Sequence, residues 1–377
     1  MNTIDKYFKE KTSNLTFIEL KENSFVELKG YVIKDELPLP ILTEGLIKGI
    51  REGSYEEEIS IGEIIQGIIY TMGTDTTFPY IEEYKEILYS YDDNIVDYIF
   101  YTAIKDLEKG KIDEGCIKLR ALLILEARNI KAIFNYGLGI EALAKKYIEE
   151  DDTKGQLFLD FSTNLFESIL DIDGDYALAH YKLGYHYLHS EQYLKASLTW
   201  KKFITRSRDE VLVQEVRNEI DRIDDDVTFE TGLTYLIYKD YEKSLNLLLQ
   251  LMPKYKDNWN LNFSIARCYI GMELYDLAIE YISEAIELND NDPDLYNELG
   301  IIYYNNGDII KAIEIFTAGI NSCENDLKLF YNRGMSLALV SEYERALEDI
   351  NKAYELEPND DILAQIQSLE DAIANQQ

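Results

Sequence analysis

The sequence is poor in cysteine. Its three cysteines, Cys116, Cys268 and Cys323, lie far apart and form no CxxC pair. A sparse and odd number of cysteines in a chain of 377 residues is typical of a protein that keeps its thiols reduced. We therefore expect a cytoplasmic protein without a disulfide framework.

Basic side chains are also few. The chain has 37 Lys and Arg against 71 Asp and Glu, which gives a formal net charge of −34. Nucleic acid and anionic lipid are disfavoured as partners, because both need basic patches to neutralise phosphates. The excess is largest in residues 225–377, which hold 10 basic and 29 acidic side chains. Partners selected by charge should be neutral or basic, and self-association is left open.

Long hydrophobic runs are missing. The first residues, MNTIDKYFKEKTSNL, have no apolar core of the kind found in a signal peptide. The most apolar stretch, ISIGEIIQGIIYTM (Ile59 to Met72), is too short to span a bilayer and contains Glu63. We predict a buried amphipathic helix there and no membrane insertion.

Residue combinations that support catalysis or metal binding are also missing. His180, His186 and His189 lie together in HYKLGYHYLH, but no carboxylate stands at ligand spacing, so we expect them at solvent or groove positions. DIDGDYALAH resembles a calcium loop, yet it has Tyr176 and Lys182 where that loop needs Gly and Glu. We predict no catalytic residue, no metal, no cofactor and no enzymatic activity.

What the sequence does contain is a repeat of 34 residues. Small side chains recur at the eighth and twentieth positions of four units that start at residues 225, 259, 293 and 327. They are Gly232, Ala266, Gly300 and Gly334 at the eighth position, and Ser244, Ala278, Ala312 and Ala346 at the twentieth. A period of this length indicates a stacked array of supersecondary units.

The pattern resembles the tetratricopeptide repeat (TPR) family, whose 34-residue unit has small residues at these two positions. Tyrosines at the eleventh and seventeenth positions, such as Tyr269 and Tyr275, also fit the family. The family's closing proline is present only as Pro358. The resemblance implies an all-α fold, a right-handed TPR superhelix (α-solenoid) of antiparallel helix pairs, here with a short α+β segment at the amino terminus.

The register divides the chain into three parts. Residues 1–95 form an amino-terminal segment, with a β-hairpin predicted around KENS in LTFIELKENSFVELKGYVI and a degenerate repeat at 62–95. Seven TPR-like repeats occupy 96–360, and an apolar stripe in 361–377 predicts a capping helix. The repeats are 96–129, 130–176, 177–210 with a helical extension 211–224, 225–258, 259–292, 293–326 and 327–360.

In the family, the fifth and ninth residues of each first helix line the concave groove, so the resemblance implies a binding surface here. Six of the seven fifth positions are aromatic. The residues predicted to bind a partner are Phe100, Phe134, Tyr181, Tyr185, Phe229, Leu233, Phe263, Arg267, Asn297, Ile301, Tyr331 and Met335. An apolar stripe of this kind usually marks an interaction site.

The composition of this surface favours one class of ligand. Family members that grip a terminal carboxylate use Lys and Asn at these positions, and Arg267 is the only basic residue among the twelve. An amphipathic or hydrophobic peptide fits better, which makes the chain a non-enzymatic adaptor or scaffold. Two alternatives stay open: a receptor for a small signalling peptide, and an enzyme with its chemistry in residues 1–95. Partial coverage of the groove by the chain itself is also left open.

Overall fold

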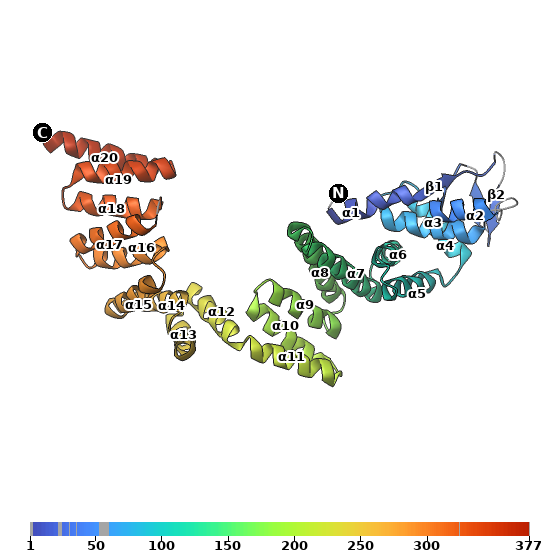
Figure 1. Ribbon diagram of the computed structural model, residues 1–377, viewed down its shortest axis with the longest axis horizontal. Helices are drawn as coiled ribbons and strands as arrows, with labels where there is room; N and C mark the ends of the chain where they lie inside the picture. Colours follow the sequence, from blue (N-terminus) through green and yellow to red (C-terminus); the bar gives the residue numbers. More distant parts are fainter. Residues whose placement is uncertain are drawn as a thin grey trace. The chain divides into compact units, whose positions relative to one another are not determined.

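The computed structural model describes residues 3–21, 25–29, 31–34, 36–52, 60–323 and 325–376. Within these residues the chain consists of stacked helices apart from four short strands near the amino terminus, as the sequence predicts (Figure 1). Contacts divide the chain into two compact units, Met1–Asn218 and Glu219–Gln377. Each unit is described by itself.

Short helices and strands open the first unit. They are α1 (Thr3–Lys9), a 3₁₀ helix (Glu10–Asn14), β1 (Leu15–Ile18), β2 (Phe25–Leu28), β3 (Tyr31–Lys34), β4 (Leu39–Leu42) and α2 (Thr43–Glu52). β1 pairs antiparallel with β4, with Leu15 opposite Leu42. β2 pairs antiparallel with β3, with Phe25 opposite Lys34.

The hairpin predicted around KENS is wrong in its pairing. β2 turns into β3 through Lys29, whose φ of 43° suits a tight turn, so the partner of β2 follows it in the chain. β1 instead bonds to β4, where Leu39 and Ile41 are fully buried and need a protected place in the core. Residues 22–24 of the predicted turn lie outside the described residues.

Helix α3 (Ile61–Thr74) is held against two neighbours by glycines. It packs on β4 and on α6 (Ile112–Leu125). Gly67 faces the carbonyl of Pro40 and Gly73 faces the carbonyl of Ile117, each so closely that an added Cβ would overlap backbone atoms. These contacts differ from the helix pair expected at 62–95, because α3 touches α4 (Ile81–Tyr91) only slightly.

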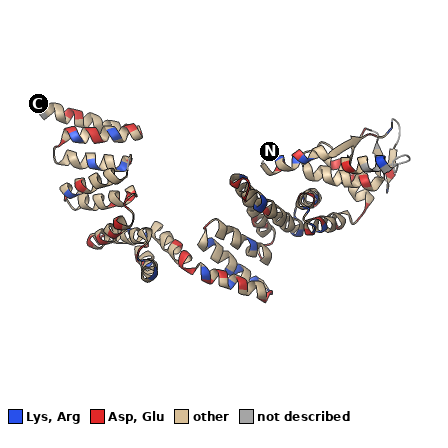
Figure 2. Cartoon of the chain, viewed as in Figure 1, with Lys and Arg blue, Asp and Glu red and all other residues tan. Residues whose placement is uncertain are grey.

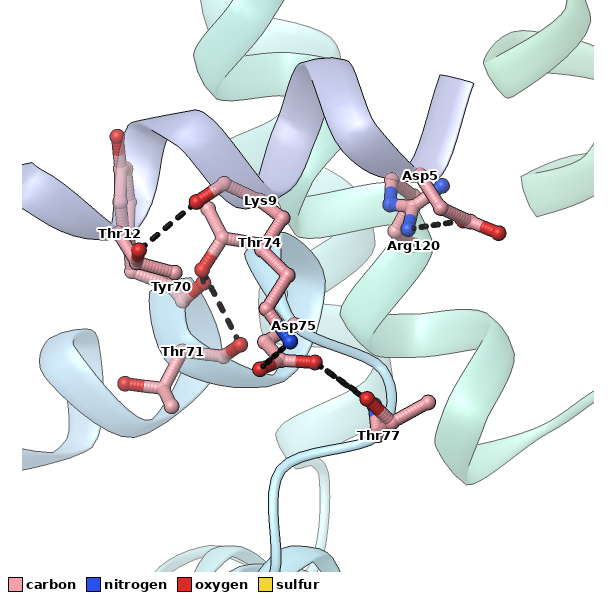
Figure 3. A network of polar contacts seen from close by, with 9 residues as sticks. All are labelled: Asp5, Lys9, Thr12, Tyr70, Thr71, Thr74, Asp75, Thr77 and Arg120. Carbon is pink, nitrogen blue, oxygen red and sulfur yellow. Dashed lines mark hydrogen bonds and ion pairs between the residues drawn. The ribbon is translucent and has the colours of Figure 1, made fainter. Parts of the chain in front are cut away.

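A buried arginine connects α1 to α3, α6 and α7 (Ile130–Ile148). Arg120 of α6 is 6% exposed and lies beside Asp5, as Figure 3 shows. Its guanidinium donates to the Gly73 carbonyl at 2.7 Å, to the Tyr136 hydroxyl at 3.0 Å and to the Asp5 carboxylate at 2.8 Å. It also lies 4.7 Å from the centre of the Phe8 ring. Since a buried charge needs its donors satisfied, these contacts fix the amino-terminal segment in the first unit.

In the described residues, seven helix pairs follow the repeat register, and each first helix begins within one residue of its predicted start. The first helices are α5 (Ile95–Glu108), α7 (Ile130–Ile148), α9 (Ala177–His189), α12 (Asp224–Ile237), α14 (Trp259–Gly271), α16 (Pro293–Asn305) and α18 (Leu327–Leu339). The second helices are α6, α8 (Asp152–Ile172), α10 (Tyr193–Arg206), α13 (Tyr241–Tyr255), α15 (Tyr275–Leu288), α17 (Ile309–Ser322) and α19 (Tyr343–Leu356). In the second unit α20 (Asp360–Gln376) packs on α19 (Figure 1).

The residues after α10 form a separate helix rather than the predicted extension of it. Helix α10 ends at Arg206, and Ser207 has extended backbone with ψ of 144°. The Asp209 carboxylate then accepts hydrogen bonds from the N–H groups of Val211 and Leu212, at 3.0 and 3.2 Å. A carboxylate in this place starts a new helix, α11 (Glu210–Arg222). The helical extension predicted at 211–224 is therefore corrected to an independent helix.

In four of the repeats the eighth residue is a glycine in contact with the twenty-fourth residue. A Cβ on Gly184 would overlap the Trp200 indole, and one on Gly300 would overlap the Phe316 ring. Trp200 and Phe316 are fully buried. A small eighth residue therefore lets a large side chain of the second helix lie flat on the first helix.

The turn inside each repeat also has a fixed geometry. Six of the seven turns place their fifteenth residue in the left-handed region: Gly110, Glu191, Lys239, Glu273, Gly307 and Ser341. Left-handed backbone is costly for residues with a Cβ, so the four turns without glycine carry strain. The following helix offsets that strain by its packing.

The close approach of α3 gives a first prediction. Gly67→Ala and Gly73→Ala should each destabilise the first unit by about 1–3 kcal/mol or more, because backbone carbonyls cannot move aside. Thermal unfolding followed by circular dichroism measures this. Gly62→Ala is the matched control on the same helix, since its Cβ would meet atoms only at 3.9 Å and beyond. Equal melting temperatures for all three variants would contradict the packing described here.

The left-handed turns give a second prediction. Gly307→Ala should cost about 1 kcal/mol through backbone strain alone. Its φ is 82° and no atom lies within 4 Å of the added Cβ, so crowding does not contribute. Gly174→Ala, in a loop without positive φ, should leave chemical denaturation unchanged. A neutral Gly307→Ala would show that the turn relaxes to another conformation.

Candidate functional site

The candidate site consists of the twelve residues predicted above from the fifth and ninth positions of the first helices, called here the helix-A surface. Ten of its twelve residues are half-buried. The two exceptions are Arg267, which is exposed, and Asn297, which is 8% exposed. The aromatic residues are therefore neither sealed inside the repeats nor fully in solvent.

In the second unit, this surface rests on the cores of four repeats. Phe229 and Leu233 pack on the buried cluster around Leu248, and Tyr331 and Met335 pack on the cluster around Ile350. The first helices α12 and α14 contact each other, as do α16 and α18. These half-buried apolar side chains, which recur at equivalent positions of successive first helices, are called here the apolar row of the second unit.

Few polar groups interrupt that row. The Arg267 guanidinium lies 5.9 Å from the centre of the Phe263 ring. The Asn297 carbonyl accepts a hydrogen bond from the Asn332 amide at 2.6 Å, so Asn297 is used inside the structure. Burial raises the pKa of Glu298, and the nearby Arg267 charge opposes that rise.

Acidic residues predominate in the second unit. Asp and Glu recur along the helices of the second unit, with few Lys or Arg between them (Figure 2). Residues 225–377 carry a net charge of −19, from 10 basic and 29 acidic side chains. A field of this sign attracts cationic groups and repels anionic ones.

In the first unit, Phe134, Tyr181 and Tyr185 of the helix-A surface contact other aromatic rings in tilted or edge-to-face arrangements. The Phe134 ring lies 5.4 Å from Phe166 and 5.8 Å from Tyr176, measured between ring centres. Tyr181 and Tyr185 meet edge to face at 5.2 Å. Phe134 is thus largely committed to its own repeat, whereas the two tyrosines line a cavity.

That cavity has a volume of about 460 Å³, within the range of small-ligand pockets. It will be called the α9 cavity. Helices α7, α8, α9 and α11 all contribute to its wall. Its polar lining includes Glu141, Tyr181, Lys182, Tyr185, His186 and Glu215.

Glu141 is the buried charge of the α9 cavity. Its carboxylate lies 2.5 Å from the Lys182 ammonium, 2.9 Å from the Lys145 ammonium and 3.7 Å from His186 Nε2. Burial alone would raise the pKa of Glu141, but His186, Lys182 and Lys145 outweigh it and hold that pKa well below its usual value. Glu141 is therefore ionised, with two lysines committed to it.

Glu215 closes the cavity from α11. Its carboxylate accepts a hydrogen bond from the Tyr181 hydroxyl at 2.8 Å and another from the Tyr185 hydroxyl. Burial, followed by the bond to Glu215, raises the pKa of Tyr181 to about 12. Burial and the bond to Glu215 raise the pKa of Tyr185 as well, so both tyrosines stay protonated donors to this exposed carboxylate.

Most of these polar residues were not among the predicted site residues. Glu141 could have been found, because a lone carboxylate in the apolar stretch GLGIEALA indicates a buried charge with a partner. Glu215 lies in an insertion, where no repeat register predicts its neighbours. The placement of the histidines was partly wrong: His180 and His186 are buried, and only His189 is exposed. His180 Nε2 bonds instead to the Gly174 carbonyl at 2.9 Å.

Neither a metal-binding cluster nor a membrane-spanning helix is found in the described part of the chain. No group of three or more His, Cys, Asp or Glu side chains there is arranged to hold a metal ion. No helix there combines the length and the hydrophobicity that crossing a bilayer requires.

Comparison with known proteins identifies the repeat. Tetratricopeptide repeat profiles match residues 260–292, 281–314 and 327–360. The BBSome complex member BBS4 of Bos taurus is 27% identical over 101 residues, which are 27% of this chain and 19% of that protein. A TPR repeat-containing protein of Methanocaldococcus jannaschii, MJ1428, is 28% identical over 122 residues, 32% of this chain and 21% of that protein. The chain thus spans about a fifth of the length of the curated relatives it matches.

Solved structures of the same repeat type are more distant. YrrB, described as a TPR protein with an unusual peptide-binding site, has 19% identity and a TM-score of 0.37, covering 54% of this chain and 97% of its own. A tetratricopeptide repeat protein from Parabacteroides merdae has 15% identity and a TM-score of 0.35, covering 73% and 98%. Scores this low do not bear on the ligand of this chain.

The profile matches fall on the helix pairs that repeat every 34 residues, with small residues at the eighth position and large ones at the twenty-fourth. The chain is a tetratricopeptide repeat protein.

Proposed function

We propose that the chain is a non-enzymatic scaffold that binds a partner protein through the helix-A surface. The occupant we infer is an amphipathic segment of the partner with one apolar face and basic residues beside it. The observation that supports this most is the combination of a half-exposed aromatic row and a net charge of −19 in the second unit. TPR proteins typically take part in protein–protein interactions, which agrees with this role.

The chemistry of the row supports an apolar contact. Phe229, Phe263 and Tyr331 offer large rings with little entropy to lose on binding, which is typical of residues that dominate interface energetics. Arg267 is the one cation among the twelve predicted residues, so a terminal carboxylate has little to hold it. Basic residues on the partner would meet the acidic side chains around the row.

The thiols support a cytoplasmic setting. Cys116, Cys268 and Cys323 are buried and unpaired. Burial raises the pKa of Cys116 and of Cys268, which keeps both as unreactive thiols. We propose that they serve packing in a reducing compartment, and that neither cofactor nor catalysis is part of the function.

A pair of designed peptides tests the proposed occupant. Two fluorescent 18-residue helical peptides would share one leucine face, and their polar faces would carry either lysine or glutamate. The lysine peptide should bind the full chain at least about tenfold more tightly at low salt, and added salt should weaken it, because the attraction is screened. Fluorescence anisotropy measures both. Equal binding of the two peptides, or none, would reject the proposal.

Matched variants locate the binding surface. Phe263→Ala with Tyr331→Ala should reduce binding of the lysine peptide about tenfold or more, since interface aromatics commonly contribute over 1 kcal/mol each. Leu277→Ala with Ile310→Ala is the control, because these side chains are 40% and 60% exposed on the second helices α15 and α17. Circular dichroism must show native helix content for both double variants. The surface assignment is wrong if the control pair loses binding as much as the test pair.

A further inference from the structure

We propose that the chain associates with a second copy of itself through the second helices of two repeats, α10 of one copy and α15 of the other. Helix α10 presents a basic face and α15 presents an acidic one. Neither face includes a residue of the helix-A surface, so this association is separate from the proposed function and is tested separately.

The first observation is the sign of the charges on α10 and α15. Helix α10 contains four cations and no carboxylate, and α15 contains four carboxylates and no cation. The cations are Lys195, Lys201, Lys202 and Arg206, and the carboxylates are Asp276, Glu280, Glu284 and Glu287. The other second helices, α6, α8, α13, α17 and α19, each carry both signs. Among the seven second helices of the described residues, only α10 and α15 therefore carry charges of a single sign.

The second observation is that these charges form matching exposed rows. All eight side chains are exposed. The four carboxylates of α15 fall within about 80° around the helix axis, and Lys195, Lys202 and Arg206 of α10 fall within about 40°. The step from Lys195 to Arg206 is 11 residues, and so is the step from Asp276 to Glu287. The basic and the acidic row are therefore equally long, at about 16 Å.

The third observation is that much of this charge has no ionic partner within its own copy. In the described part of the chain, none of the four carboxylates of α15 forms an ion pair, and neither do Lys201 and Lys202. The other two cations of α10 pair with Glu167 and Asp175, with nitrogen–oxygen distances of 3.5 and 2.6 Å. Surface pairs of this kind contribute little to stability and can be exchanged for other partners.

The spacing of the like charges is unfavourable within each helix. Lys202 and Arg206 are four residues apart, and so are Asp276 and Glu280. Side chains at this spacing are neighbours on the helix surface, where opposite charges stabilise and like charges destabilise. A face of opposite sign laid along each row would relieve this repulsion in both helices together.

A second copy is the occupant that these charges fit best. It brings a row of the opposite sign and the same length to each face, and it is present wherever the chain is. A nucleic acid fits α10 less well, because a chain with a net charge of −34 repels an extended polyanion. Two copies also repel each other, but at 0.15 M salt the screening length is about 8 Å. The attraction between faces in contact is then screened less than the repulsion between the rest of the two chains.

The contact is small, so the association should be weak and reversible. Each helix has 14 residues and is about 21 Å long. One face of such a helix buries far less than the roughly 1,200 Å² of a stable complex, and exposed ion pairs add little each. We expect a Kd of about 100 µM to 1 mM. Since two different faces meet, copies can join head to tail, and masses of two copies or more are expected.

Sedimentation equilibrium of the full chain measures this association. In 0.15 M salt the weight-average mass should rise above that of a monomer as the concentration increases to about 500 µM. Raising the salt to 1 M should abolish that rise, because the screening length falls to about 3 Å. A monomer mass at every concentration in 0.15 M salt would overturn the proposal.

Charge-reversed variants identify the two faces. Lys201→Glu with Lys202→Glu alters α10, and Glu280→Lys with Glu284→Lys alters α15. Each double variant alone should have a Kd at least tenfold higher than the unmodified chain, because like charges then meet at the centre of the contact. An equal mixture of the two should associate within about threefold of the unmodified chain, since each supplies the intact face that the other lacks. Association of either variant alone like the unmodified chain, or a mixture no better than its components, would overturn the proposal.

Net charge is controlled in two ways. Lys109→Glu with Lys131→Glu changes the net charge as much as the α10 variant does, at exposed lysines of the first unit outside α10, and should leave the Kd unchanged. The α15 variant makes the chain less negative, so general repulsion would predict stronger association rather than the expected loss. Circular dichroism must show native helix content in every variant. An equal loss in the control variant would overturn the assignment to α10.

Discussion

The structure depends on one contact repeated along the chain, between the small eighth residue of a first helix and the large twenty-fourth residue of the second. Gly184 with Trp200 and Gly300 with Phe316 show it most clearly, because no Cβ fits between them. The ring fills the space that the missing side chain leaves, so the two helices approach closely and bury apolar surface worth several kcal/mol in each repeat. Hydrogen bonds reinforce the crossing, as when the Trp200 indole donates to the Tyr181 carbonyl at 3.2 Å.

That contact also determines which residues of the first helix remain outside the core of the repeat. Once one face of the first helix is committed to its partner, the residues at the fifth and ninth positions must lie at the edge of the core. They are half-buried for this reason, with packed bases and accessible tips. A globular protein can place such residues against another layer, but a stack of helix pairs has no further layer to supply. An apolar row along the first helices is thus a consequence of the repeat architecture. Because the fold leaves this apolar surface accessible, it is available for binding a partner.

The repeat could be predicted from the sequence because the contact between the eighth and twenty-fourth residues joins positions close together in the chain. Gly300 and Phe316 lie 16 positions apart, and the same spacing separates Gly184 from Trp200 and Gly334 from Ile350, so periodicity finds the contact. The register also places each first-helix start within one residue. The amino-terminal segment lacks that help. The pairing of β1 with β4 joins strands separated by two others, and the docking of α3 on α6 joins residues about 45 positions apart, such as Gly73 and Ile117. Neither has a periodic signal, and the local alternation around KENS favoured the wrong partner. The α11 helix was misread for a related reason: a single aspartate, Asp209, starts it within three residues of the end of α10.

The α9 cavity illustrates where a repeat protein can acquire a distinct site. Identical repeats present the same residue types at the same positions. A binding surface made only of apolar fifth and ninth residues does not discriminate between apolar partners. Chemical selectivity needs departures from the register, and three of them meet here: the lone carboxylate Glu141, the buried His186 and the inserted helix that brings Glu215. Glu141 and His186 are buried polar residues, placed where an apolar side chain would cost less. The chain itself offsets much of that cost, because the Glu141 carboxylate is paired with Lys182 and Lys145 and lies beside His186, and the Glu215 carboxylate accepts hydrogen bonds from Tyr181 and Tyr185.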